Sequence, residues 1–325
     1  MRRIAVLPLL CAALPFGCTT LSGDERDQLA IHQRNAQLYF EGGKLQQALV
    51  QVERGLEIDP DDYKLNAIQG AVLLRAAGND RQLLDRATAV LQKVYEWRSP
   101  RRHEPYLLLN LALAEQKQGL RRLGEAIRLE DQTTRAPNDD KRAELAQQAA
   151  EERTRATARL ERADELLRVL VERGEILRVV HFHRAQIARQ LRDDAEFLAA
   201  TEAFLAESAK AQQFVKSEVE RTTTPEYEAE QLRALQQLRE EEIEMRALLA
   251  DWHFDRQQYE AALAQLDRVL EIDPKRSVDY YNRGRVLIEL ERIEAAKADF
   301  RRFLATSPLP ASSDKKTFAV QALAK

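Results

Sequence analysis

The pentapeptide Leu-Glu-Ile-Asp-Pro occurs twice in this chain, ending at Pro60 and again at Pro274. Small residues stand twelve and twenty-four positions before each proline: Ala36, Ala48, Ala250 and Ala262. Near the C-terminus the same intervals return with Gly284, Ala296 and Pro308. Small residues let two helices cross closely, and proline stops the second helix. The spacing therefore predicts repeated pairs of antiparallel helices.

This layout resembles the tetratricopeptide repeat, a 34-residue unit made of two antiparallel helices. Three units carry the resemblance, at 29–62, 243–276 and 277–310, and the last two follow each other in register. The resemblance implies an all-α fold in which helical hairpins stack into a superhelix. The two pentapeptides are 214 residues apart, which is not a multiple of 34, so the array must be interrupted.

Degenerate repeats are predicted between the clear ones. Residues 63–99 fit a second unit with Gly70 and Ala87 where the helices cross, and 105–132 resembles the opening helix of a third, with Gly119 as a small residue. A worn copy is predicted at 181–214, where Ala188 and Ala200 keep the spacing.

The middle of the chain departs from the repeat pattern. Between 141 and 173 the apolar residues alternate three-and-four spacing, which is typical of a seam that packs against another helix: Ala149, Ala156, Leu160, Ala163, Leu167 and Leu170. A second long helix is predicted from Pro225. These helices are interpreted either as lengthened repeat helices or as a coiled-coil hairpin.

The predicted organisation follows from these patterns. It comprises a leader at 1–17, a polar tether at 18–28, N-terminal repeat helices at 29–135, a long-helix section at 136–242, a repeat pair at 243–310 and a capping helix at 311–325. The cap is expected because the last repeat would otherwise expose its apolar face.

The first residues predict the compartment. Two arginines precede an apolar stretch at 4–16, which is too short to span a bilayer and ends at Gly17-Cys18. The segment resembles a bacterial lipoprotein signal, which implies cleavage between Gly17 and Cys18 and lipidation of the Cys18 thiol. Thr19 in place of aspartate implies an outer-membrane anchor facing the periplasm. The alternatives are an ordinary secretory signal and an uncleaved anchor.

The sequence gives no indication of a catalytic site or a cofactor site. The sequence has no G-x-S-x-G, H-E-x-x-H or phosphate-loop motif, so we expect no enzyme and no cofactor. His181 and His183 would point about 200° apart on a helix and cannot share a metal ion, and we interpret them as an inert surface pair. The carboxylates at 240–242 are interpreted as a solvated face. A net charge of −3 without a basic block gives no sign of nucleic-acid binding.

Protein binding is the function that the resemblance implies. In tetratricopeptide repeats the first helix of each unit lines a groove, at fixed positions of the unit. Carried onto the three clear units, these positions predict as groove residues Gln33, Gln37, Phe40, Glu41, Ala247, Asp251, Phe254, Asp255, Tyr281, Arg285, Ile288 and Glu289. Gln33 and Gln37 stand where repeats that clamp a C-terminal carboxylate carry Lys and Asn, so that subtype is disfavoured.

We therefore expect a membrane-anchored scaffold. The resemblance is to outer-membrane lipoproteins that assist the assembly or secretion of envelope machines or tether cell-wall enzymes, with envelope proteins as partners in the groove and the membrane as partner of Cys18. The alternative is a structural spacer, or a coiled-coil protein that self-associates through 141–173 and 225–250.

Overall fold

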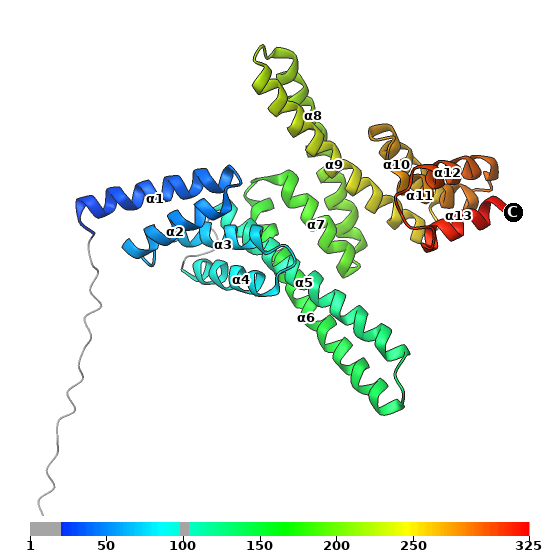
Figure 1. The fold of residues 1–325 in the computed structure, drawn as a ribbon, viewed down its shortest axis with the longest axis horizontal. Coiled ribbons are helices and arrows are strands. Elements are labelled where there is room, and N and C mark those ends of the chain that lie inside the picture. The colour runs from blue at the N-terminus through cyan, green and yellow to red at the C-terminus, as the bar shows by residue number, and fades with distance from the viewer. Residues whose placement is uncertain (1–20, 98–103, 325) are drawn as a thin grey trace, which may run out of the picture. The chain divides into compact units, whose positions relative to one another are not determined.

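The computed structural model describes residues 21–97 and 104–324, and in these residues all the regular structure is helical, which confirms the predicted all-α fold (Figure 1). Their helices are α1 (Gly23–Glu41), α2 (Leu45–Ile58), α3 (Tyr63–Ala77), α4 (Arg81–Glu96), α5 (Pro105–Thr134), α6 (Asp139–Glu172), α7 (Leu177–Leu191), α8 (Asp194–Arg221), α9 (Pro225–Asp255), α10 (Tyr259–Ile272), α11 (Ser277–Glu289), α12 (Ile293–Thr306) and α13 (Asp314–Ala324). The predicted signal sequence and Cys18 lie outside the described residues.

The chain forms two compact units. The first ends at His103 and contains α1 to α4, and the second begins at Glu104 and contains α5 to α13. This differs from the predicted N-terminal section at 29–135, because α5 belongs to the second unit. The apolar face of α5 is buried along α6, so the natural boundary falls before α5 and not after it.

The first unit consists of two helical hairpins, α1–α2 and α3–α4, as the spacing predicts. Ala36 and Ala48 are completely buried where α1 crosses α2. In the second hairpin, a Cβ atom on Gly70 would lie 2.5 Å from Cγ of Leu91, so no larger residue fits without a shift. The absence of a side chain thus sets the distance between α3 and α4.

The start of α1 corrects the predicted tether at 18–28. Helix α1 begins at Gly23, because Ser22 and Glu25 form a reciprocal cap. The Ser22 hydroxyl accepts a hydrogen bond from the Glu25 backbone N–H at 3.3 Å, and the Ser22 N–H donates to Glu25 Oε2 at 2.8 Å. Residues 23–28 are therefore helical.

Helices α5 and α6 form a long antiparallel hairpin (Figure 1). All six residues of the predicted seam at 141–173 are buried, and α6 packs mainly against α5. Gly119 makes the closest approach, since a Cβ there would lie 2.8 Å from Cγ of Leu160 and 3.2 Å from the carbonyl oxygen of Ala156. Beside the seam, the nearly buried carboxylate of Glu115 accepts from Arg159 at 2.7 Å.

This packing decides between the two interpretations of the middle helices. It also corrects the prediction that these helices self-associate. The long helices are the two arms of a hairpin within one chain. The six apolar residues of the 141–173 seam are buried within the chain, so they are not available for the predicted self-association. Residues 225–250 likewise bury Leu235 and Leu238 against Val215 of α8.

Helices α7 and α8 form the worn repeat predicted at 181–214. Ala188 and Ala200 are buried at its crossing, and Phe197 and Phe204 fill the core beside them. Beyond this hairpin α8 continues, and α9 returns along it after the turn at 222–224. One long helix thereby joins the worn repeat to the C-terminal repeats.

The C-terminal repeats are built from α9 to α12 and closed by α13. Ala250, Ala262 and Ala296 are buried at the crossings. A Cβ on Gly284 would lie 2.8 Å from Cε1 of Phe300, as close as at Gly119. Helix α13 buries Ala319 on this core and so fills the place of the predicted capping helix.

Replacing Gly119 by alanine tests the role of close packing in the long hairpin. We expect Gly119→Ala to lower the free energy of unfolding by about 1–3 kcal/mol, because the added methyl meets Leu160 and a backbone oxygen. The measurement is urea denaturation followed by circular dichroism.

Gly124 on the same helix is the matched control, because a Cβ there meets nothing within 4 Å. Gly124→Ala should stabilise the protein by about 0.5–1 kcal/mol through helix propensity alone. Equal effects of the two changes would contradict the close approach.

Candidate binding face of the C-terminal repeats

The predicted groove residues of the first repeat are engaged within the chain. Gln33 is half-buried and its side chain donates to Asp62 Oδ2 at 2.6 Å, while Gln37 donates to Glu41 Oε1 at 2.5 Å. Phe40 is half-buried, and the guanidinium of Arg75 lies 5.8 Å from the centre of its ring. Gln37 and Glu41 are exposed, but the side-chain amides of Gln33 and Gln37 already form hydrogen bonds within the chain.

Tyr281 is a core residue and not an aromatic contact in a groove. Its side chain is 8% exposed and lies among Phe300, Phe303 and Phe318, with ring centroids 5.2–6.1 Å apart. The position faces inward here because α13 covers it. This corrects the prediction that Tyr281 lines the groove.

The seven other predicted residues of the C-terminal repeats lie on the first helices of these repeats with part of their surface accessible. Phe254, Arg285 and Ile288 are half-buried, whereas Asp251 and Asp255 are exposed. The Arg285 guanidinium carbon lies 4.5 Å from the centre of the Phe254 ring, so α9 and α11 meet through a cation–π contact. Ala247 is half-buried and Glu289 is exposed.

Two residues that the repeat positions did not nominate complete this surface. Arg189 of α7 donates to Asp255 Oδ2 at 2.6 Å, and the Nζ atom of Lys315 lies 5.4 Å from the centre of the Tyr281 ring. We call Arg189, Asp251, Phe254, Asp255, Arg285, Ile288 and Lys315 the C-terminal face. A 34-residue step from Tyr281 reaches Lys315, and Arg189 is the ninth residue of the worn copy, so extending the register would have found both.

Asp251 lies near charged side chains from four helices of the face, α7, α9, α11 and α13. Asp251 is exposed as a residue, but the protein around its carboxyl group removes water and so raises its pKa, and the nearby charge of Asp255 raises this pKa further. Arg189, Arg285 and Lys315 oppose this shift. Asp251 is thus within electrostatic range of three cations of the face.

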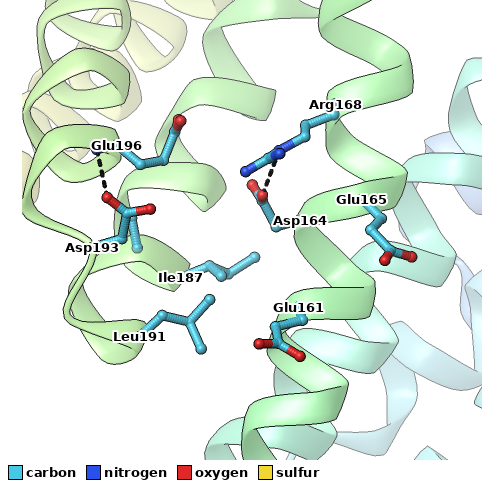
Figure 2. A pocket seen from close by; sticks show the side chains of 9 residues that line it. Glu161, Asp164, Glu165, Arg168, Ile187, Leu191, Asp193 and Glu196 are labelled. Atoms are coloured by element: carbon cyan, nitrogen blue, oxygen red, sulfur yellow. Dashed lines mark hydrogen bonds and ion pairs between the residues drawn. The ribbon is translucent and has the colours of Figure 1, made fainter.

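A second feature is a cleft of about 420 Å³ between α6, α7 and the start of α8 (Figure 2). Acidic side chains dominate its lining, but a buried arginine organises them. Arg184 donates to Asp164 at 2.9 Å and lies 2.8 Å from Glu196, and Arg168 lies 2.7 Å from the other oxygen of Asp164. This network fixes the long hairpin to the worn repeat, and removing one partner would leave a buried charge unpaired.

Two sequence-based interpretations of polar residues need correction. His181 and His183, interpreted as a surface pair, are only partly exposed on α7, and burial lowers the pKa of His183 to about 4. Glu242 is buried and not solvated. Burial acts to raise its pKa, but hydrogen bonds from Arg246 and Gln212 hold the pKa below its usual value.

Two further observations concern the described residues alone. Across 21–97 and 104–324, no group of three His, Cys, Asp or Glu side chains is arranged to hold a metal ion. In the same ranges, no helix combines the length and the apolar character that a bilayer crossing requires.

Comparison with known proteins supports the repeat assignment. A tetratricopeptide repeat family model matches residues 249–321, which run from the C-terminal end of α9 through most of α13. This part of the chain is thus similar to tetratricopeptide repeats. No curated protein matches the sequence.

Several solved structures are similar at low sequence identity. A tetratricopeptide repeat protein from Parabacteroides merdae is 13% identical with a TM-score of 0.41, and the match covers 92% of this chain and 100% of that one. The nuclear import adaptor Nro1, a hypoxic regulator of sterol synthesis, is 14% identical with a TM-score of 0.42, covering 92% and 93%. A thermophilic repeat protein from Thermus thermophilus is 15% identical with a TM-score of 0.27, covering 93% and 100%.

Proposed function

We propose that this protein is a lipid-anchored scaffold of the bacterial envelope, whose C-terminal face binds a segment of another envelope protein. The observation that carries the binding role is the convergence of α7, α9, α11 and α13 on one surface, joined by the Arg189–Asp255 and Arg285–Phe254 contacts. Repeats of this kind present such surfaces to extended or helical partner segments.

The anchoring part of the proposal is supported by the leader sequence. Gly17-Cys18 ends an apolar stretch of signal-peptide length, and α1 begins five residues after Cys18. Two or more acyl chains on one cysteine hold a protein firmly to a membrane, whereas one chain binds reversibly. A lipidated Cys18 would therefore keep α1 close to the outer-membrane surface on the periplasmic side.

The alternative of a self-associating spacer is less well supported. The two long hairpins, α5–α6 and α8–α9, give the chain rigid arms that suit a spacer. The apolar seam residues of these hairpins, however, are buried within one chain, so a coiled-coil assembly could not use them.

The binding role is tested by placing a photo-crosslinking amino acid at Glu289, which is exposed and adjoins the C-terminal face. We expect irradiation of cells expressing the full chain to yield a discrete crosslinked product, because a bound segment would lie within reach. Mass spectrometry of the product identifies the partner.

The matched position is Arg301 on α12, which is also exposed but lies on the second helix of the same repeat. A label there should give little or none of that product. Equal products at the two positions, or none at either, would refute the binding role of this face.

The anchor is tested by Cys18→Ala. We expect this change to abolish incorporation of labelled palmitate and to release the protein from membranes, because the thiol is the proposed site of acylation. Cys11→Ala is the control and should keep both properties. Label that persists in Cys18→Ala would show that the anchor lies elsewhere.

A further inference from the structure

Two arginines on α11 differ sharply in their surroundings. Arg283 donates to both oxygens of Asp299, at 2.7 and 2.9 Å, and to Asp267 at 2.8 Å. Its pKa is raised, first of all by the hydrogen bonds to Asp299. The donors of Arg283 are thus used to hold α11 against α10 and α12.

Arg285, two residues further, is held by aromatic rings instead. Its guanidinium carbon lies 4.5 Å from the centre of the Phe254 ring and 6.0 Å from that of Tyr281. In the part of the chain that the structure describes, no carboxylate forms a hydrogen bond or close ion pair with Arg285. A guanidinium stacked on a ring keeps its N–H edge free to bind a carboxylate with two parallel hydrogen bonds.

Lys315 repeats this arrangement on α13. Its Nζ atom lies 5.4 Å from the centre of the Tyr281 ring, and it too forms no close ion pair with another described residue. Of the two acids on the face, Asp255 is already paired with Arg189. Among the seven residues of the face, Asp251 is then the one remaining carboxylate for the two cations, Arg285 and Lys315. Glu289, which adjoins the face, interacts with the Tyr259 hydroxyl and forms no close ion pair with either cation.

We infer that the C-terminal face selects an acidic partner segment, in which an Asp or Glu side chain binds Arg285 and an adjacent apolar side chain packs on Ile288 and Phe254. This inference rests on the proposed binding role of the face. Charge complementarity supports an acidic segment, because Arg285 and Lys315 form no close ion pairs in the chain and would repel a basic segment. The stacked guanidinium is also preordered, so little side-chain entropy is lost on binding.

The test is a selection of random dodecapeptides, displayed through their C-terminal ends, on the immobilised full chain. Display in this form leaves no free C-terminal carboxylate, so any acid that is selected is a side chain. We expect enriched peptides to carry Asp or Glu next to an apolar residue. Synthetic versions of these peptides should bind about tenfold more weakly to Arg285→Gln.

Arg301→Gln is the matched control, since Arg301 is exposed on α12 and outside the face. It should bind the peptides like the unaltered protein, and circular dichroism checks that both variants are folded. Replacing the selected Asp or Glu of the peptide by its amide should weaken binding to the unaltered chain by about the same factor. The same replacement should change binding to the Arg285→Gln variant little, because that variant has already lost the partner of the acid.

The outcomes separate this inference from the proposed function. Peptides that are enriched without acids, or acidic peptides that bind Arg285→Gln unchanged, would overturn the acidic specificity and leave the binding face in place. Enrichment of no peptide at all would overturn both.

Discussion

The close crossing of paired helices at small residues is the constraint on which the rest of the structure depends. At Gly70, Gly119 and Gly284 a single added carbon would lie 2.5–2.8 Å from a neighbouring side chain. At the other crossings alanine is buried to 4% exposure or less. Because each pair of helices is held at this short distance, successive first helices stay near each other, and their side chains can form one binding surface.

The long hairpins follow the same constraint over a greater length. Gly119 nests on Leu160, and ion pairs such as Glu115–Arg159 border the apolar seam. The network around Arg184 then ties α6 to α7 and α8. The consequence for function is indirect, because this junction positions α7, and α7 supplies Arg189 to the C-terminal face.

The sequence predicted the features that depend on local or periodic patterns of residues. It did not predict the features that depend on contacts with helices distant in the chain. Small residues and prolines at fixed intervals located the repeat hairpins, and apolar spacing located the seam of α6. The tight turn between paired helices was harder to predict from the sequence. Gly43 has φ +71° in this turn, and Gln257 and Glu291 adopt φ +60° and +58° at the equivalent positions of the last two repeats. Only the first of these three carries the residue that signals a left-handed turn. The burial of Tyr281 was missed because the covering helix α13 lies outside its repeat.

A double-mutant cycle between Gly284 and Phe300 tests the central constraint most directly. Gly284→Ala adds a carbon that meets the Phe300 ring, and Phe300→Leu removes much of that ring. If the contact sets the helix distance, the two changes together should destabilise the protein by less than the sum of the single changes, by about 1 kcal/mol in urea denaturation. Additive effects within about 0.3 kcal/mol would contradict the account, because the two residues would then not share the space between α11 and α12.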